Sequence, residues 1–491
     1  MNQLLLTLLE EFSDKINTSA EGIIREAKFP AVSNKVMVAI GMRRTGKTYF
    51  LLQIIKKLLK DHVTFSRILY INFEDNRLSS FTSDTLSELL DSFYSLYPEN
   101  HDQLCYFFLD EIQNVENWQL VIRRYLDTKK IKIYLTGSSA KLLSKEIATS
   151  LRGRAITKEI WPFNFTEYML AKQISFPKTL GKKNLDKLIF LLKDYINKGG
   201  FPEPLECDLE RELIKIWSKV LNKSKIGIND EFFSLGGTSL HLIQIVQTIK
   251  NSLGMDLNIN TILNASTISQ LRETIGMSEG DRRAILQGYV DIVIFRDIVE
   301  RYKITNITLI RYMIKFLLNN IGCSFSVHKF YNDLKSQGFA VAKTTVHDYL
   351  SYIEDAYLAF TVPLYSDSLR KIQVNPRKIY AVDSGLTKAC TFGFSENFGH
   401  AFENLIYLEL RRAGHQIYYY LTHTRKEVDF LTQGPTGERY LFQVCWDTKN
   451  VKTLTREIVA LQEAEKELNI KGECITADSY FTSFLPFLHR G

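Results

Sequence analysis

The sequence predicts a multidomain protein in which an α/β fold with a parallel sheet is interrupted by a small all-α bundle. Apolar strand patterns at 36–40 and 106–109 are followed by a glycine-rich loop and by an acidic turn, respectively, as is typical of parallel α/β sheets. Between about 206 and 278, apolar residues recur at helical spacing and form a self-contained pattern. Strand and helix patterns resume after 279, so the bundle is predicted to be an insertion.

Length and composition indicate an ordinary globular protein. The 491 residues are enough for about three to four domains, and 62 basic against 55 acidic residues permit contact with nucleic acid without demonstrating it. The six cysteines lack the spacing of a zinc site or a disulfide framework, which favours a reducing compartment. The N-terminal segment lacks the features of a signal peptide, and no apolar run reaches the ~20 residues of a membrane span. We therefore expect a cytoplasmic protein without a membrane partner.

The segment 36–59 combines an apolar strand, the loop GMRRTGKT and an amphipathic helix. The loop fits the pattern G-x-x-x-x-G-K-[ST], in which Gly41 and Gly46 let backbone N–H groups surround phosphates at a helix N-terminus. Lys47 would contact the β- and γ-phosphates, and Thr48 would bind magnesium. The alternative is a chance match on a strand-to-helix turn. The predicted ATP-binding residues of this loop are Gly41, Arg43, Arg44, Thr45, Gly46, Lys47 and Thr48.

The apolar strand CYFFL is followed by two carboxylates. Asp110 would hold Mg²⁺ together with Thr48 and belongs to the predicted ATP-binding set, and Glu111 would polarise the attacking water as a catalytic residue. An Asp-Glu pair alone is usually a solvated turn. Its position after a buried strand and downstream of a phosphate loop favours the catalytic interpretation.

A further strand, IKIYLTGSSA, ends in hydroxyl side chains, and Ser138 is predicted to sense the γ-phosphate or position the water. A helix-capping role is the alternative for such a serine. The following segment SLRGRA places Arg152 and Arg154 close together on a turn. Either guanidinium could reach a transferring phosphoryl group in cis or from a neighbouring subunit of a homo-oligomer, and ion pairing with nearby acids is the alternative.

The motifs GMRRTGKT, FFLDEIQ, LTGSSA, LRGRA and KGGFPEP resemble the bacterial and archaeal AAA-type ATPases that carry a C-terminal domain of unknown function. The resemblance covers nearly the whole chain outside the insertion. It implies a P-loop NTPase domain with a RecA/AAA-like parallel sheet, a winged-helix segment and a degenerate nuclease-like fold, with ATP and Mg²⁺ as ligands. The predicted domains are the ATPase at 1–205, the insertion at 206–278, the winged-helix segment at 279–370 and the C-terminal α/β domain at 371–491.

The insertion is predicted to be a four-helix bundle with helices at about 210–221, 239–251, 259–264 and 267–275. The residues at helical spacing that are predicted to form its core are Leu213, Ile216, Trp217, Val220 and Leu221 on the first helix and Leu240, Ile243 and Val246 on the second.

The blocks IWSKVLN, INDEFFSLGGTSL and ASTISQLRETI are similar to peptidyl or acyl carrier domains of nonribosomal peptide and polyketide synthases. The resemblance implies that Ser239 is the attachment point of 4′-phosphopantetheine. A phosphopantetheinyl transferase would then be a partner. Gly236 and Gly237 would keep the approach open, and the helix N-terminus would favour the negative phosphodiester. The alternative is that Thr238 or Ser239 is an ordinary N-cap. Because no adenylation or other loading signature occurs in the chain, an acyl or aminoacyl loading enzyme would act in trans.

Residues 304–365 suggest a winged helix-turn-helix, with a second helix at about 343–355 that exposes Lys343, Thr344, Thr345 and His347 near its start. Arg370, Lys371, Arg377 and Lys378 add further basic residues. Duplex DNA is therefore a candidate partner. A protein–protein module with a solvated basic face is the alternative.

The C-terminal segment resembles the PD-(D/E)xK nuclease scaffold through Glu403, Asp429 and Gln443. That chemistry needs two carboxylates for a divalent metal and a lysine that activates water. Cys445 stands at the lysine position, so we expect a retained fold without phosphodiester cleavage.

Together these features predict a Mg²⁺-dependent ATPase that carries a phosphopantetheinylated domain for thioester-bound acyl or aminoacyl groups. The alternative is a DNA-associated regulatory ATPase in which the insertion acts only as an interaction module. Because the insertion falls at a clean boundary, an engineered fusion is a third possibility.

Overall fold

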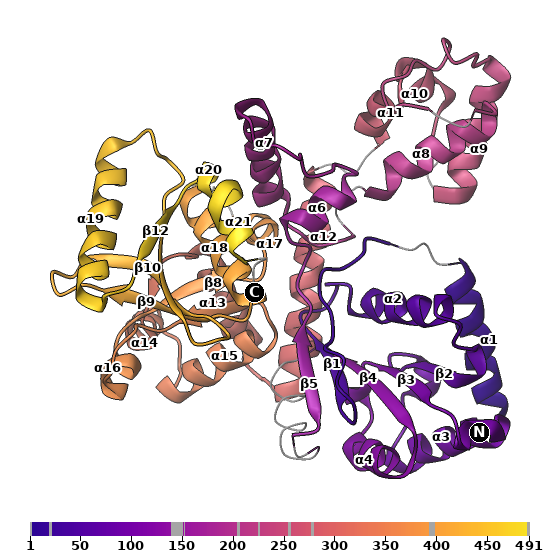
Figure 1. Cartoon of the computed structure of the whole chain (residues 1–491), viewed down its shortest axis with the longest axis horizontal. Coiled ribbons are helices and arrows are strands. Elements are labelled where there is room, and N and C mark those ends of the chain that lie inside the picture. The colour runs from indigo at the N-terminus through magenta and orange to yellow at the C-terminus, as the bar shows by residue number, and fades with distance from the viewer. Residues whose placement is uncertain are drawn as a thin grey trace. The chain divides into compact units, whose positions relative to one another are not determined.

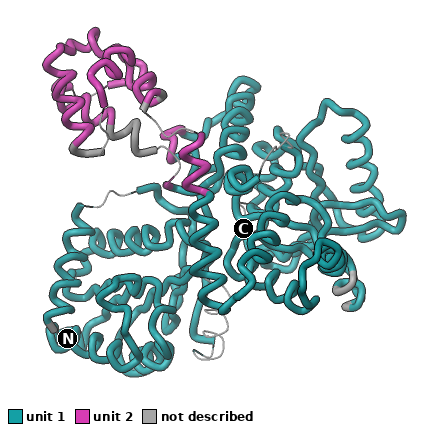
Figure 2. The backbone as a smooth tube through the Cα atoms, turned by 180° about the vertical axis from the view of Figure 1, so that it is seen from behind, with its two compact units in different colours: residues 1–170, 175–202, 287–491 teal, residues 171–174, 203–286 magenta. Residues whose placement is uncertain are grey.

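The computed structural model describes residues 2–18, 22–138, 151, 153–203, 207–223, 226–253, 257–275, 279–391 and 398–488. The chain forms two compact units, coloured in Figure 2. The larger unit contains residues 1–170, 175–202 and 287–491, and the smaller contains residues 171–174 and 203–286. Among the described residues, no helix is long and apolar enough to cross a membrane.

The N-terminal part of the larger unit is built on a five-stranded sheet in the order β2-β3-β4-β1-β5, in which every neighbouring pair is parallel. Because β4 lies between β1 and β3, the carboxyl ends of these three strands meet at one edge of the sheet. The strands are β1 (Val36–Ile40), β2 (Ile68–Asn72), β3 (Cys105–Asp110), β4 (Ile131–Gly137) and β5 (Ala155–Glu159).

Helices cover both faces of this sheet, as the buried strands require. Figure 1 shows α2 (Lys47–Lys60) on one side of the sheet and α3 (Ser83–Leu96) and α4 (Trp118–Thr128) on the other. Neighbouring residues of β3 point to opposite faces. Phe108 joins the core with α2 and α1 (Asn2–Thr18), whereas the ring of Phe107 lies 6.3 Å from that of Tyr125 in α4.

The segment after β5 contains α6 (Phe165–Ala171) and α7 (Lys182–Lys198) and reaches the small unit at residue 203. The chain returns through α12 (Glu279–Ile292), which continues into the π-helix η5 (Val293–Glu300). A π-helix of this length is unusual, since most occur as single-turn bulges.

A winged helix-turn-helix follows η5. Its helices are α13 (Ile307–Asn319), α14 (Val327–Ser336) and α15 (Lys343–Asp355), and the short α16 (Leu369–Val374) precedes the last strand. The antiparallel sheet β6-β8-β7 consists of β6 (Ser324–Phe325), β8 (Arg377–Ala381) and β7 (Ala359–Val362). The predicted helix-turn-helix is confirmed, and α15 spans the residues predicted for its second helix.

The C-terminal part is an α/β domain with a sheet in the order β12-β11-β10-β9. One face of the sheet packs on α19, through Leu441 of the sheet and Leu461 of the helix. The elements are α17 (Ser384–Cys390), α18 (Phe398–Arg412), β9 (Gln416–Leu421), β10 (Glu427–Gln433), β11 (Arg439–Val444), α19 (Val451–Leu468), β12 (Gly472–Ile475), α20 (Ala477–Ser479), η6 (Tyr480–Phe484) and α21 (Leu485–Leu488).

The small unit is a helical bundle made of α8 (Cys207–Val220), α9 (Ser239–Leu253), α10 (Ile259–Asn264) and α11 (Ile268–Ile275). Its core contains Trp217, whose ring lies 5.0 Å from that of Phe232. The predicted core residues of α8 are confirmed, since Leu213, Ile216 and Trp217 are buried and Val220 and Leu221 pack against them.

The core face predicted for α9 is wrong at two positions. Leu240 and Ile243 are 64% and 48% exposed, whereas Leu242, Ile245 and Ile249 are buried and Val246 is partly buried. Leu242, Ile245, Val246 and Ile249 follow the complete i, i+3, i+4, i+7 helical pattern, whereas Gln244 and Gln247 interrupt the pattern that begins at Leu240. The full pattern therefore marks the buried stripe, which the three residues of the prediction were too few to show.

Candidate functional site

The phosphate-loop motif connects β1 to α2 at the carboxyl edge of the five-stranded sheet. Both motif glycines have positive φ angles, 149° at Gly41 and 92° at Gly46. A Cβ atom on Gly41 would lie 2.2 Å from the backbone oxygen of Ile160, so no other residue fits there. The glycines therefore allow the loop to turn tightly between strand and helix.

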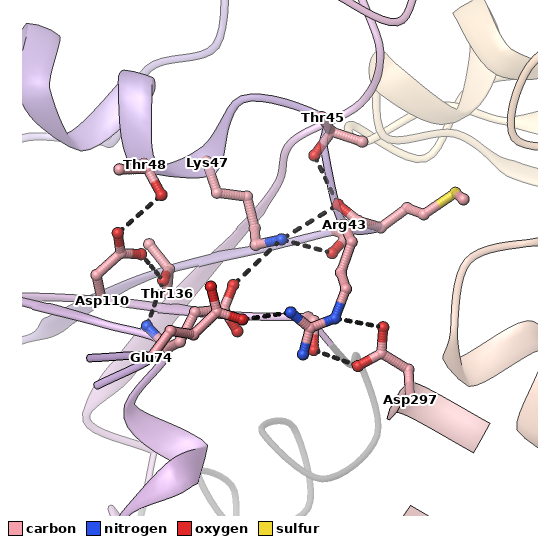
Figure 3. A network of polar contacts seen from close by, with 12 residues as sticks. Arg43, Thr45, Lys47, Thr48, Glu74, Asp110, Thr136 and Asp297 are labelled. Atoms are coloured by element: carbon pink, nitrogen blue, oxygen red, sulfur yellow. Dashed lines mark hydrogen bonds and ion pairs between the residues drawn. The ribbon is translucent and has the colours of Figure 1, made fainter. Parts of the chain in front are cut away.

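Lys47 is buried at the start of α2 and points back into the loop (Figure 3). Its Nζ donates hydrogen bonds to the backbone oxygens of Gly41 and Met42, each at 3.1 Å. The Oε1 atom of Glu111 lies 3.6 Å from the same ammonium. The ammonium is thus held mainly by two neutral acceptors, which a phosphate could replace.

Asp110 ends β3 and accepts hydrogen bonds from three hydroxyl groups. The hydroxyl of Thr48 lies 2.7 Å and that of Tyr70 3.0 Å from its Oδ2, and Thr136 of β4 donates to its Oδ1. Burial and the adjacent Glu111 raise the pKa of Asp110, although these hydroxyls oppose the shift. Carboxylate and hydroxyl oxygens are ligands that Mg²⁺ prefers, so Thr48 and Asp110 fit the predicted metal-binding role.

Glu111 follows Asp110 with a left-handed backbone, φ 53°, which turns its side chain towards Lys47. Its backbone N–H donates to the hydroxyl of Thr136 at 2.8 Å, so one threonine bonds both the carboxylate of Asp110 and the backbone of Glu111. Burial alone would raise the pKa of Glu111, but Lys47 and Arg43 lower it below the usual value. Glu111 is therefore ionised at neutral pH.

Ser138 and Arg43 share a partner that the sequence did not suggest. The hydroxyl of Ser138 donates to Asp297 Oδ1 at 2.7 Å, and Arg43 Nε donates to Asp297 Oδ2 at 2.9 Å. Figure 3 shows the guanidinium of Arg43 between Asp297 and Glu74. Arg43 also forms an ion pair with Glu74. Asp297 is buried, and burial raises its pKa despite Arg43 and Ser138.

The remaining loop residues, Thr45 and Arg44, have contacts both within the loop and outside it. Thr45 is buried and its hydroxyl donates to the oxygen of Met42, while its own backbone oxygen accepts from Arg25 Nη1 at 2.8 Å. The guanidinium of Arg44, with φ 67°, lies over the ring of Tyr289 at 5.7 Å. No local motif marks Arg25, Tyr70, Glu74, Tyr289 or Asp297, because their contacts with the site arise only in the folded chain.

Of the two predicted arginine fingers, Arg154 does not lie at this edge of the sheet. Arg154 precedes β5, and its backbone oxygen accepts a hydrogen bond from Val36 at the start of β1, the end opposite the phosphate loop. Its side chain forms an ion pair with Asp127. Arg152 lies outside the described residues. Supply of Arg154 by a neighbouring subunit stays a prediction.

Ser239 begins α9 and is exposed. The hydroxyl of the preceding residue, Thr238, accepts a hydrogen bond from the backbone N–H of His241 at 3.4 Å, so Thr238 acts as the N-cap. A Cβ atom on Gly237 would lie 2.4 Å from the buried ring of Phe232, whereas one on Gly236 would meet nothing within 4 Å. Gly237 is thus required by packing, and the space around Gly236 is open.

In the C-terminal domain, Glu403 and Asp429 come together as predicted, but a lysine lies between them. Lys378 Nζ is 2.5 Å from Glu403, 2.9 Å from Asp429 and 3.0 Å from Glu427, and its side chain is 2% exposed. Gln443 Nε2 donates to Asp429 at 2.9 Å. The prediction that Lys378 adds to the basic residues for DNA contact is therefore wrong, because β8 turns this side chain inward.

These residues do not fit the divalent metal that a nuclease-like fold implies. The position between the carboxylates already holds the Lys378 ammonium, and the side-chain amide of Gln443 bonds the other oxygen of Asp429. Among the residues that the structure describes, no group of three His, Cys, Asp or Glu could hold a metal ion.

The predicted DNA-facing residues have different surroundings. Lys343, Thr344 and His347 at the start of α15 are exposed, and Thr345 is partly buried. Arg370 and Lys371 of α16 are also exposed. The exposed residues remain available to a partner, which Lys378 is not.

Family models agree with the fold and define the class of protein. Residues 33–169 match the model described as an AAA domain, and residues 211–275 match the model described as a phosphopantetheine attachment site. Residues 273–396 and 398–481 match two models described as domains of unknown function, DUF8612 and DUF4143. The chain therefore combines an AAA ATPase-like domain with a phosphopantetheine carrier domain.

A close relative extends along almost the whole chain. The uncharacterized protein MJ1544 from Methanocaldococcus jannaschii is 34% identical over 459 residues, which cover 93% of this chain and 84% of that protein. The chain belongs to the same family as this archaeal protein. The predicted resemblance to AAA-type ATPases with a C-terminal domain of unknown function is confirmed.

The carrier unit is similar to parts of peptide synthetases. Gramicidin S synthase 2 from Brevibacillus brevis is 35% identical over 80 residues, which are 16% of this chain and 2% of that protein. The solved structure of BlmI, a type-II acyl-carrier-protein from Streptomyces verticillus involved in bleomycin biosynthesis, is 28% identical. That match covers 14% of this chain and 82% of that chain, with a TM-score of 0.14.

Proposed function

We propose that the chain binds and hydrolyses ATP with Mg²⁺ at the phosphate loop and carries 4′-phosphopantetheine on Ser239. The observation that supports ATP hydrolysis best is the convergence of Lys47, Thr48, Asp110 and Glu111 in one hydrogen-bonded network at the edge of the sheet. Lys47 and Thr48 begin α2, Asp110 ends β3 and Glu111 follows it. Thr136 of β4 joins them.

Each side chain has a defined part in the proposed reaction. Lys47 exchanges its backbone acceptors for phosphate oxygens, and Thr48 and Asp110 hold Mg²⁺, which neutralises phosphate charge when bound. Glu111 is ionised, because its pKa is lowered by Lys47 and Arg43 against the effect of burial. It orients the attacking water and accepts its proton.

Release of inorganic phosphate from ATP tests this part of the proposal. Turnover should require Mg²⁺ and stop when the metal is chelated, since the phosphates then lose their divalent counter-ion. Turnover that continues in excess chelator would contradict the assignment of Thr48 and Asp110.

The exposed position of Ser239 at the start of α9 supports attachment of the prosthetic arm. Because Thr238 caps the helix, the hydroxyl of Ser239 is not needed for that role. The exposed apolar side chains of Leu240 and Ile243 lie on the same helix and offer a docking face for a transferase and a loading enzyme. The arm would hold an acyl or aminoacyl group as a thioester, loaded in trans.

Intact mass after incubation with coenzyme A and a phosphopantetheinyl transferase tests attachment. One phosphopantetheine per chain is expected on the wild type and none on Ser239→Ala. Ser234→Ala, in the same loop, is the matched control and should be modified like the wild type. An unmodified wild-type chain, or a Ser239→Ala chain that still gains the group, would contradict the proposal.

A second candidate function is regulation at DNA, supported by the exposed Lys343, Thr344 and His347 at the start of α15. Binding to a DNA duplex should then weaken steeply as salt rises, and Lys343→Ala should reduce the salt dependence. Binding that is absent, or that does not respond to salt, would exclude this function.

A further inference from the structure

Asp297 occupies hydrogen-bond donors that a nucleotide phosphate would need. Arg43 of the phosphate loop and Ser138 after β4 were both predicted to bind ATP, and each donates to the carboxylate of Asp297, at 2.9 and 2.7 Å. The other acceptors around the loop, such as Glu74 and Glu111, belong to the ATPase domain at 33–169. Asp297 is contributed by the segment that follows the carrier insertion.

The helix that bears Asp297 has an unusual local structure. Residues 293–300 form a π-helix that directly continues α12, and Asp297 lies in its middle. The π-helical hydrogen-bond pattern is less favourable than the α-helical one and often marks functional sites. The carboxylate of Asp297 joins this segment to Arg43 of the phosphate loop and to Ser138.

The same helix and the segment before the insertion both contact the phosphate loop. The ring of Tyr289 in α12 lies 5.4 Å from that of Phe201 and beneath the guanidinium of Arg44 at 5.7 Å. On the other side of the insertion, Pro202 Cγ would lie 3.9 Å from a Cβ atom on Gly46. The larger unit leaves off at residue 202 and resumes at residue 287. Pro202 and Tyr289, which contact the phosphate loop, therefore lie at or close to these two ends.

We propose that Asp297 is a nucleotide-responsive latch, whose carboxylate competes with the γ-phosphate of ATP for Arg43 and Ser138. When a triphosphate binds, Asp297 loses these two donors and η5 is released from the phosphate loop. Because η5 continues α12, the release loosens the segment by which the chain returns from the carrier insertion. This inference rests on the proposed binding of ATP and assigns Asp297 a positioning role.

A purely structural role for Asp297 makes a different prediction. If the carboxylate only stabilised the loop in its binding shape, its removal would weaken ATP and ADP alike. A competing carboxylate instead acts against the additional phosphate, because two negative groups cannot share the same donors. The ratio of the affinities for triphosphate and diphosphate therefore distinguishes a competing carboxylate from a purely structural one.

The affinity experiment compares Asp297→Asn with the wild type, using the nonhydrolysable Mg²⁺·AMP-PNP and Mg²⁺·ADP. Asp297→Asn keeps the shape and removes the charge, and should tighten binding of the triphosphate analogue about tenfold with a much smaller change for ADP. Asp291→Asn is the matched control, because Asp291 lies on the same helix but pairs with Arg311 at 2.9 Å. It should leave both affinities unchanged.

Amide hydrogen exchange of the wild-type chain tests the release directly and does not depend on a variant folding. Residues 287–302 should exchange faster with Mg²⁺·AMP-PNP than with Mg²⁺·ADP or without nucleotide. In Asp297→Asn these residues should already exchange fast without nucleotide.

The outcomes separate the latch from the proposed function. Bound AMP-PNP without faster exchange in 287–302, or equal loss of both nucleotide affinities in Asp297→Asn, would overturn the latch and leave ATP binding intact. Failure of the wild type and of Asp297→Asn to bind either nucleotide would overturn both proposals. Tighter triphosphate binding with faster exchange supports the latch.

Discussion

Two buried lysines of this chain, Lys47 and Lys378, show how neighbouring acceptors decide what a lysine does. The ammonium of Lys47 donates to two backbone oxygens at 3.1 Å, and its carboxylate neighbour Glu111 is 3.6 Å away. The ammonium of Lys378 is within 3.0 Å of three carboxylates, those of Glu403, Glu427 and Asp429. Lys47 is therefore held mainly by neutral acceptors, whereas the positive charge of Lys378 is paired with carboxylates.

The difference explains why only one of these lysines suits ligand binding. A phosphate can replace the two neutral acceptors of Lys47, because their hydrogen bonds are weaker than those to an anion. A phosphate at Lys378 would have to displace the carboxylates of Glu403, Glu427 and Asp429, which would then lose the cation that they share. Lys378 therefore joins β8 of the winged-helix sheet to α18 and β10 of the C-terminal domain, and its role is structural.

The largest expected effect is loss of stability when Lys378 is removed. Lys378→Met leaves buried carboxylates without their cation and should lower the local free energy of unfolding by about 3–5 kcal/mol. Amide hydrogen exchange of β8 and β10 measures the change. Lys371→Met, an exposed lysine on α16, is the control and should change little. A Lys378→Met chain as stable as the wild type would contradict the structural role of Lys378.

Removal of the carboxylate beside Lys47 should affect chemistry and not folding. Glu111→Gln leaves the water without a proton acceptor and should lower the rate of ATP turnover about 10²–10³-fold, equivalent to about 3–4 kcal/mol in activation free energy. Binding of ATP should persist. Steady-state phosphate release measures the effect, with the exposed Glu116→Gln as a control in the same segment. Normal turnover of Glu111→Gln would remove Glu111 from the mechanism.

A smaller effect is expected on how the stability of the Lys378 cluster depends on pH. Burial and then Asp429 raise the pKa of Glu403 to about 7, although Lys378 opposes the shift, because one cation serves three carboxylates. Between the usual carboxyl pKa of about 4.5 and 7, the unfolded chain has released this proton while the folded chain still holds it. The contribution of Glu403 to stability is therefore full below pH 4.5 and is lost as pH rises towards 7, by at most about 1.4 kcal/mol per pH unit.

Unfolding experiments at several pH values measure this contribution. Glu403→Gln should flatten the fall in stability between pH 4.5 and 7, whereas replacement of the exposed Glu10 should not. An unchanged slope in Glu403→Gln would mean that the Lys378 cluster does not keep a proton.

The sequence predicted the parts of the site that local patterns encode. The phosphate loop at 41–48 and the carboxylates after β3 are fixed by spacing along a strand and a turn, and the structure places Lys47, Thr48, Asp110 and Glu111 together. Asp297 could not be predicted in this way, since it reaches Arg43 from 254 positions along the chain. No local pattern distinguishes it from any other helical aspartate.

Lys378 and the α9 helix show two further limits of sequence patterns. The nuclease-like motif was expected to lack its lysine at Cys445, yet β8 supplies a lysine to the same carboxylates from another part of the fold. On α9, Leu242 has apolar residues at i+3, i+4 and i+7, whereas Leu240 has glutamines at i+4 and i+7, and Leu242 is the one buried in the core with α8 and α10. A tertiary contact, which spacing does not record, decides the first case, and the length of the pattern decides the second.

Calorimetric titration of Mg²⁺·AMP-PNP into three proteins, the wild type, Lys47→Ala and Lys378→Met, tests the central claim most directly. One binding site per chain is expected in the wild type, no measurable binding in Lys47→Ala, and binding with unchanged affinity in the folded fraction of Lys378→Met. Binding that survives in Lys47→Ala, or a folded Lys378→Met that no longer binds, would contradict the assignment of these two lysines.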